Sequence, residues 1–191
     1  MRIILASSSP RRAEILRQAG IPFEMLATNS DESPRENESP PELVLRLAKA
    51  KASAAAAQTF GPAIVLGADT EVIIDGQVLG KPVSSDDART MLRRLSGRVH
   101  DVITGLALIR VPGNALRVEH ETTRVTFAAM SEEEIAAYIA TGEPFDKAGA
   151  YAIQGIGGRY VTRIDGCYFN VMGLPLARLY RMLRELGWKE E

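Results

Sequence analysis

The sequence predicts a mixed α/β fold, because segments with strand-like and helix-like patterns alternate along the chain. Short apolar runs bounded by turn residues are typical of strands, and several segments between them carry apolar residues at helical spacing. At 191 residues, of which 46% are hydrophobic and 25% charged, the chain can bury a sizeable core. We therefore expect a single domain over residues 1–191, of the α/β or α+β class.

Strands are expected where runs rich in apolar and β-branched residues end in turn residues. Two long runs, 99–111 and 116–127, flank a Pro-Gly-Asn turn at 112–114, and Asp75-Gly76 predicts a tight hairpin turn. The expected strands are 2–6, 23–27, 64–66, 72–74, 77–79, 99–111, 116–127 and 160–164.

Helices are expected where a capping residue precedes apolar residues at helical spacing. Ser9 followed by Pro10 is typical of a helix start, and Ser39 and Ser131 each precede a glutamate by three residues, as in a capping box. The expected helices run from 10 to 19, from the cap at 39 to about 59, from 84 or 85 to the glycine at 97, from 131 to 142, and from about 175 to 186. The polar segment 29–41 predicts a loop, and the glycine-rich segment 145–158 predicts a functional loop or a broken strand.

Charge and cysteine content narrow the classes of function. A net charge of −1 gives no overall positive field, so neither nucleic acid nor a membrane is an expected partner. Cys167 is the only cysteine, which excludes an internal disulfide and a cysteine-based zinc site. No apolar run is long enough to span a bilayer or to form a signal-peptide core, so we expect a cytoplasmic protein.

Two arginines stand in the first turn of the first expected helix, where acidic residues are normally favoured. That turn has unpaired N–H groups and a positive dipole end, to which Arg11 and Arg12 add further positive charge. Backbone N–H groups, the hydroxyls of 7–9 and two guanidinium groups together would suit a phosphate chain. The alternative is that both arginines extend into solvent or pair with acidic residues elsewhere.

Lys51 interrupts the apolar stripe of the second expected helix. It follows Leu47 by four residues and Val44 by seven, so it belongs to the face that should meet the core. A lysine in this place usually extends to the edge of the apolar surface. The other interpretation, which we prefer because Arg11 already favours an anion, is that its ammonium reaches a phosphate in a cleft.

Asp69 follows the buried run 64–68, so we expect it at the end of a strand. A carboxylate there can bind a metal ion, act as general base for a water, or do both, although it can also cap a turn with Thr70. Glu32, on the acidic loop, is the candidate second carboxylate. Mg²⁺ takes carboxylate and water ligands, so acidic residues for metal and basic residues for phosphate form a consistent set.

Two further lysines are candidates for phosphate contact, namely Lys81 after a strand and Lys147 in the glycine-rich segment. Either can equally be an ordinary surface residue. The sequence contains neither a Walker-type phosphate loop nor a Gly-x-Ser-x-Gly motif. Of the two histidines, we interpret His120 as a surface residue and His100 as a structural or hydrogen-bonding one, which argues against a histidine-ligated zinc site.

Blocks of sequence spread over nearly the whole chain resemble the Maf family of nucleoside triphosphate pyrophosphatases. The blocks are 7–12 (SSSPRR), 31–32 (DE), 46–48 with 51–52, 67–70 (GADT), 80–82 (GKP), 96–97 with 100, 146–155 (DKAGAYAIQG) and 170–175 (NVMGLP). Their order and joint occurrence make the resemblance specific.

The resemblance implies an elongated mixed sheet flanked by helices around a deep cleft, similar to the inosine triphosphate pyrophosphatase-like fold, with one Maf-like domain of two lobes. It also implies hydrolysis of a nucleoside triphosphate to the monophosphate and pyrophosphate with a divalent cation, Mg²⁺ or Mn²⁺. The 146–155 block resembles the branch that acts on dTTP and UTP, with CTP and modified pyrimidine triphosphates as further candidates. A homodimer is the candidate assembly.

The resemblance also implies roles for individual residues. Asp69 matches the proton acceptor and, with Glu32, the metal site, while Lys51 and Lys81 are the catalytic cations. The substrate-binding candidates are Ser8, Arg11, Arg12, Thr70, Lys147 and Gln154, of which Arg11, Thr70 and Gln154 match positions that set substrate choice. This sequence departs from the usual pattern with Glu71 after Thr70, where an apolar residue is more common, and with Ser8 in place of a frequent glycine.

Two alternatives remain at this point. One is the same chemistry on 7-methyl-GTP, against which the 146–155 block argues. The other is a non-enzymatic nucleotide-binding regulator of septum formation, against which the complete set of acidic and basic residues argues.

Overall fold

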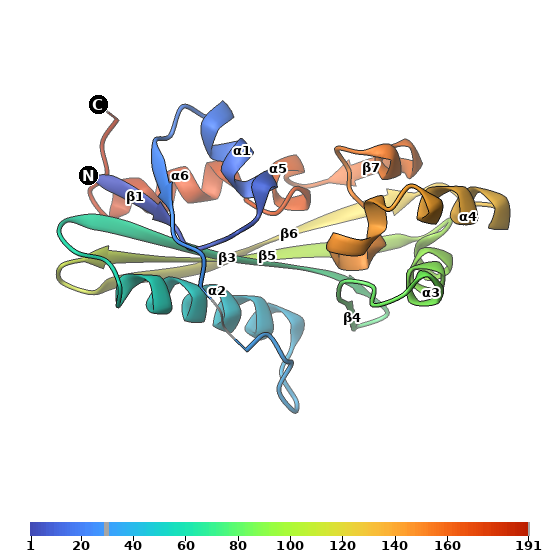
Figure 1. The fold of residues 1–191 in the computed structure, drawn as a ribbon, viewed down its shortest axis with the longest axis horizontal. Coiled ribbons are helices and arrows are strands. Elements are labelled where there is room, and N and C mark those ends of the chain that lie inside the picture. The colour runs from blue at the N-terminus through green and yellow to red at the C-terminus, as the bar shows by residue number, and fades with distance from the viewer. Residues whose placement is uncertain (29–30, 191) are drawn as a thin grey trace. The chain divides into compact units, whose positions relative to one another are not determined.

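The computed structural model describes residues 1–28 and 31–190, so positions 29 and 30 of the predicted 29–41 loop lie outside the described part. The strands form a seven-stranded sheet in the order β2-β1-β3-β5-β6-β7, with β4 paired to β3 (Figure 1). They are β1 (Arg2–Leu5), β2 (Phe23–Met25), β3 (Ala63–Ile74), β4 (Gln77–Leu79), β5 (Val99–Val111), β6 (Ala115–Phe127) and β7 (Val161–Asp165).

The predicted helices are confirmed, with small shifts at their ends. The α-helices are α1 (Pro10–Gln18), α2 (Pro40–Ala56), α3 (Ser85–Leu95), α4 (Glu132–Ala140), α5 (Tyr168–Val171) and α6 (Leu176–Glu185). Short 3₁₀ segments, η1 (Glu143–Asp146), η2 (Ala148–Ala150) and η3 (Ile156–Tyr160), occupy the glycine-rich segment. The one-turn helix α5 was not predicted, because four residues are too few for a helical pattern. None of the helices in the described residues is both long and apolar enough to cross a membrane.

The sheet is mixed, as the resemblance implied. Strand β1 pairs in parallel with β2 and β3, and Ile4 lies opposite Glu24 on one side and Val65 on the other. Strand β3 pairs antiparallel with β4, and β6 pairs antiparallel with β7. The two runs 64–66 and 72–74, which we expected as separate strands, belong to the single strand β3.

The chain divides into two compact units. The first unit comprises Met1–Asp69, Thr104–Glu121 and Gly173–Glu191, and the second comprises Thr70–Ile103 and Thr122–Met172. In the first unit, alanines of α2 pack with residues of β1, β3 and β5; this cluster includes Ile4, Ala48, Ala52, Ala55, Val65 and Ala107. In the second unit, a cluster contains Val72, Leu92, Val125, Phe127, Tyr138 and Tyr151. The predicted single domain stays a prediction.

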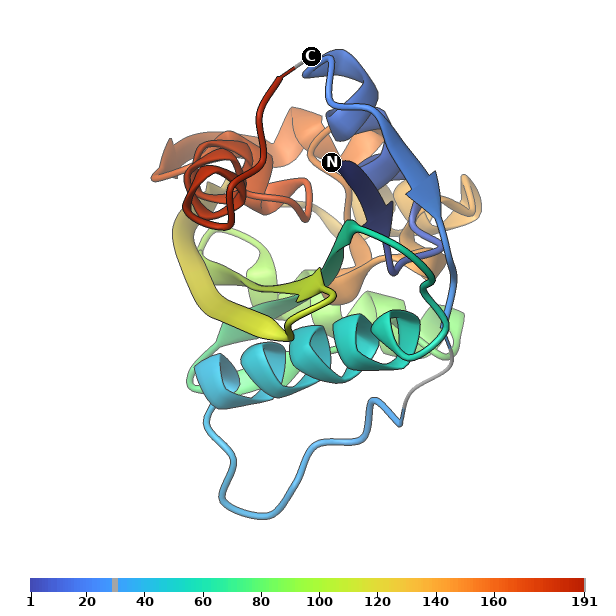
Figure 2. The same cartoon turned by 90° about the vertical axis from the view of Figure 1, so that its left-hand side faces the viewer.

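Helix α2 packs unusually close to strands β3 and β5 within the first unit. A Cβ atom added to Gly67 of β3 would lie 2.1 Å from the carbonyl oxygen of Ala48, and one added to Gly105 of β5 would lie 2.3 Å from that of Val44. Such distances leave no room for a side chain, so both glycines are required by the approach of the helix backbone. Helices α1 and α6 lie on the other side of these strands from α2 (Figures 1 and 2).

We expect Gly67→Ala to destabilise the protein by about 1–3 kcal/mol, the usual cost of overpacking a close-packed interior. The added methyl group has to push the helix backbone away, since the nearest atoms belong to the main chain. Urea unfolding measures the change. Gly80→Ala is the control, because nothing lies within 4 Å of a Cβ at that position. Equal stability of the two variants would contradict the packing argument.

Candidate functional site

The segment 7–12 joins β1 to α1 and is held by its own side chains. Ser9 is the N-cap of α1, and its backbone N–H donates to Ser7 Oγ at 3.1 Å. Arg12 donates from Nε to the carbonyl oxygen of Gly173 at 2.8 Å and from Nη1 to Ser7 Oγ at 3.2 Å. Arg12 therefore does not simply extend into solvent, because its guanidinium holds this segment to the residues before α6. Arg11 is partly buried and Ser8 is exposed in the same segment.

Asp69 lies inside strand β3 and not at its end, which corrects our expectation. The strand continues through Gly67, where the absence of a side chain is explained by the close approach of α2. The side chain of Asp69 is only 8% exposed. Its Oδ2 atom is buried and has no hydrogen-bond partner among the described residues. A buried carboxylate oxygen in this state is uncommon and is typical of a functional position.

Lys51 connects the two predicted acidic residues within the first unit. Its Nζ lies 2.6 Å from Asp69 Oδ1 and 2.5 Å from Glu32 Oε1, and its side chain is 12% exposed. The prediction that Lys51 lies on the core-facing side of α2 is confirmed. The structure brings Glu32, Lys51 and Asp69 together from a loop, a helix and a strand.

The predicted metal site passes a test of donor chemistry. No group of three or more histidine, cysteine or acidic side chains is placed to hold a metal ion in the part of the chain that the structure describes. Mg²⁺ is commonly held by one or two carboxylates together with substrate phosphates and water. Asp69 and Glu32 provide two such carboxylates, and the buried Oδ2 atom has no protein partner in the described residues. The donor set therefore fits a cation that is bound largely through the substrate.

Arg46 is a site-supporting residue that the sequence argument did not single out. Its Nε lies 2.5 Å from Glu38 Oε1, and its Nη2 donates to the carbonyl oxygen of Ser33 at 3.0 Å. These contacts attach the acidic loop next to Glu32 to the helix that carries Lys51. A paired acidic residue eight positions before Arg46 was the available signal.

The remaining predicted site residues belong to the second unit. Lys81 is exposed, and its loop is joined to that of Lys147 by a hydrogen bond from the Gly149 N–H to the Gly80 carbonyl oxygen at 3.1 Å. Lys147 Nζ pairs with the carboxylate of Asp146 and donates to the Glu143 carbonyl oxygen at 2.8 Å. Thr70 of β3 is partly buried, and Gln154 is exposed in a turn of the glycine-rich segment.

His100 has the structural role that we expected. Its Nε2 is 2.9 Å from the hydroxyl of Tyr151, and its ring meets those of Phe127 and Tyr151 edge to face. Burial lowers the pKa of His100 to about 4, so the imidazole is neutral at physiological pH.

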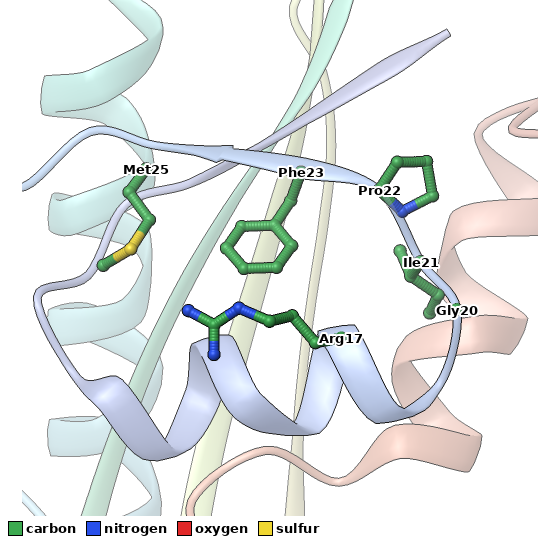
Figure 3. A pocket seen from close by; sticks show the side chains of 6 residues that line it. All are labelled: Arg17, Gly20, Ile21, Pro22, Phe23 and Met25. Carbon is green, nitrogen blue, oxygen red and sulfur yellow. The ribbon is translucent and has the colours of Figure 1, made fainter.

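A separate hollow of about 570 Å³ lies between the end of α1 and strand β2 (Figure 3). Its lining residues are Arg17, Gly20, Ile21, Pro22, Phe23 and Met25. The guanidinium carbon of Arg17 stacks 5.9 Å from the centre of the Phe23 ring. The site residues predicted from the sequence are not among the residues of this hollow, so we assign it no part in the chemistry.

Comparison with solved structures supports the predicted fold class, and comparison with protein families identifies the family of this chain. The Ham1 protein of Staphylococcus aureus has a similar fold, with a TM-score of 0.51 and 14% identity over 97% of this chain and 100% of that one. This likeness supports the predicted inosine triphosphate pyrophosphatase-like fold class. Residues 2–186 match the family described as Maf-like protein, and the chain belongs to this family.

Curated relatives in this family carry a more specific name. A dTTP/UTP pyrophosphatase of Symbiobacterium thermophilum is 54% identical over 187 residues, which cover 98% of this chain and 95% of the relative. A dTTP/UTP pyrophosphatase of Caldicellulosiruptor bescii is 50% identical over 98% of this chain and 96% of the relative.

We expect the Arg46–Glu38 pair to make folding depend on pH in the acid range. Hydrogen bonding to Arg46 lowers the pKa of Glu38 from 4.5 to about 2. A carboxyl with a lowered pKa stabilises the folded state fully above its unfolded value, and this contribution is lost as the pH falls from 4.5 through 2. NMR titration of the Glu38 carboxyl in Arg46→Ala should show its pKa returning toward 4.5.

The control is Arg93→Ala, which removes an arginine that pairs with Glu132. That variant should leave the Glu38 titration unchanged. A Glu38 pKa that stays near 2 in Arg46→Ala would show that Arg46 does not cause the shift.

Proposed function

We propose that this protein hydrolyses dTTP and UTP to the nucleoside monophosphate and pyrophosphate with the help of a divalent cation. The names of the relatives that are about half identical over nearly the whole chain support the reaction and the substrates. The single structural observation that carries the proposal is Asp69, a buried carboxylate whose Oδ1 contacts Lys51 and whose Oδ2 has no partner in the described residues.

Asp69 is the proposed proton acceptor. Lys51 and the surrounding strand fix the carboxylate through Oδ1, which leaves Oδ2 to orient a water and to take its proton as that water attacks the α-phosphorus. The α–β phosphoanhydride bond then breaks, and pyrophosphate leaves with the bonding electron pair. Mg²⁺ or Mn²⁺ would be held by Asp69 and Glu32, where a bound cation neutralises phosphate charge and makes a coordinated water more acidic.

Basic side chains are proposed to neutralise charge on the phosphate chain. Arg11 and Ser8 contact phosphate oxygens directly, and Arg12 contributes mainly by holding the segment 7–12 in place through Gly173. Lys81 and Lys147 are proposed as further contacts for phosphate oxygens, as the resemblance implies. Lys51 stabilises charge that develops on the leaving group, since fixed charges in a dry site need little reorganisation during the reaction.

Base choice is assigned to Gln154 and Thr70. The Gln154 amide has both a donor and an acceptor, so it can match the polar edge of a pyrimidine, and the Thr70 hydroxyl can assist. The expected homodimer and cytoplasmic location also remain proposals, which light scattering and cell fractionation would test.

Pyrophosphate release from a panel of nucleoside triphosphates, with Mg²⁺, with Mn²⁺ and after chelation, tests the proposed function. We expect metal-dependent turnover of dTTP and UTP, and Asp69→Asn should reduce kcat by at least about 10²–10³-fold, because the amide cannot accept a proton. Asp86→Asn, at an exposed position of α3, is the matched control for loss of one carboxylate. Circular dichroism should show both variants folded.

Three outcomes would contradict the proposal. Near-normal turnover by Asp69→Asn would remove this residue from the mechanism. Activity confined to 7-methyl-GTP would keep the chemistry and overturn the substrate class. Binding of nucleotides without any turnover would favour the alternative of a non-enzymatic nucleotide-binding regulator.

We expect Lys51→Met to lower kcat/KM for dTTP by roughly 10²-fold or more, because two acidic side chains lose their shared cation and the leaving group loses a positive charge. Steady-state kinetics measures the loss. Lys49→Met is the control, since Lys49 is exposed on the same helix. Similar losses in both variants would indicate a general effect of helix charge and would contradict a specific role for Lys51.

A further inference from the structure

The glycine-rich segment of the second unit is organised around the carboxylate of Glu143. Its Oε1 accepts hydrogen bonds from the Tyr138 hydroxyl at 2.7 Å and the Gly157 N–H at 3.0 Å, and its Oε2 accepts one from the Ile156 N–H at 2.8 Å. Gln154 lies two residues before Ile156 in the same turn. The side chain of Glu143, in helix η1, thus binds the backbone two and three residues after Gln154, to which we assign base choice.

The glycines of this turn are fitted to Glu143 and Tyr138. A Cβ atom at Gly155 would lie 2.2 Å from Glu143 Oε2, and one at Gly157 would lie 2.5 Å from the Tyr138 hydroxyl oxygen. Neither position has room for a side chain, so the turn closes directly over the carboxylate. The backbone N–H of Ala152 adds a longer contact of 3.4 Å to the same hydroxyl, on the other side of Gln154.

Glu143 is itself held in place from several directions. Its N–H donates to Thr141 Oγ1 at 3.2 Å, and its carbonyl oxygen accepts from Lys147 Nζ at 2.8 Å. Partial burial raises the pKa of the Glu143 carboxyl, but the hydrogen bonds from Gly157, Tyr138 and Ile156 outweigh burial, and the pKa is lower than usual. The group is therefore an ionised acceptor at neutral pH, suited to backbone N–H donors.

We propose that Glu143 is a positioning residue for substrate selection, which sets the turn of Gln154 and the backbone beside Lys147 so that the amide meets the pyrimidine base. This inference rests on the proposed function, because Gln154 matters only if the chain binds a nucleotide. Glu143 acts through Gln154 and does not touch the reacting atoms.

Glu143→Gln tests the proposal, because a glutamine amide group would face backbone N–H donors where the carboxylate now accepts. We expect KM for dTTP and UTP to rise about tenfold with kcat changed less than about twofold, and preference over GTP to fall by a similar factor. Glu133→Gln removes one exposed carboxylate from α4 in the same unit and is the control. Amide hydrogen exchange at Ile156 and Gly157 should accelerate in Glu143→Gln only.

A double-mutant cycle with Gln154→Ala separates positioning from general stability. If Glu143 acts through Gln154, the change Glu143→Gln should have little further effect on KM and base preference in the Gln154→Ala background. The same loss in both backgrounds would overturn the proposal and leave a merely structural role. Tyr138→Phe removes one of the three hydrogen bonds to the Glu143 carboxylate and should give a smaller rise in KM and a smaller loss of base preference. This variant replaces Glu143→Gln in the experiment if Glu143→Gln does not fold.

Different experimental results would contradict this inference and the proposed function. A wild-type chain that turns over neither dTTP nor UTP contradicts the function, and the inference falls with it. A wild-type chain that is active on both, with unchanged selectivity in Glu143→Gln, overturns the inference alone.

Discussion

The close approach of helix α2 to the strands beneath it is the constraint on which the catalytic arrangement depends. Gly67 and Gly105 remove the side chains that would otherwise hold the helix away, and the helix meets them with its own backbone carbonyl groups. At this spacing a lysine on the helix can reach a carboxylate on the strand without extending into water. Gly67 and Asp69 therefore act together, since the close approach of α2 at Gly67 lets Lys51 reach Asp69.

A single ammonium group lies between two carboxylates in the first unit, which leaves this group of side chains with an excess negative charge. Lys51 is shared by Asp69 and Glu32, and one turn earlier along α2 Arg46 binds Glu38 of the same acidic loop. The loop is thus fixed by cations at two points, which limits where Glu32 can go. Charge here serves geometry more than stability, because a shared buried cation keeps each carboxylate in a defined orientation.

The sequence was sufficient for the five longer helices and for strands β5 and β6, because periodicity and caps are local properties. It did not predict the one-turn helix α5 or the unbroken strand β3. The sequence was not sufficient where the residue type at a position is determined by contact with a residue that is distant along the chain. The sequence placed a strand end at Asp69, but β3 continues, and Gly67 is required by contact with Ala48 and Ala52 of helix α2, which precede it by 19 and 15 residues. Glu143 had no local signal for its partners at Ile156 and Gly157, since only the folded chain brings that turn back onto it. The acidic residue eight positions before Arg46 was a signal that the sequence argument did not use.

Strands β3, β5 and β6 each begin in one unit and end in the other, so neither unit is one uninterrupted piece of chain. The first unit uses three separate stretches of sequence and the second uses two. Recombination at a single point cannot exchange one unit for another, and no continuous fragment of the chain consists of one unit alone. Divergence of substrate range in such an architecture has to proceed by substitutions within loops, while the shared strands preserve the frame.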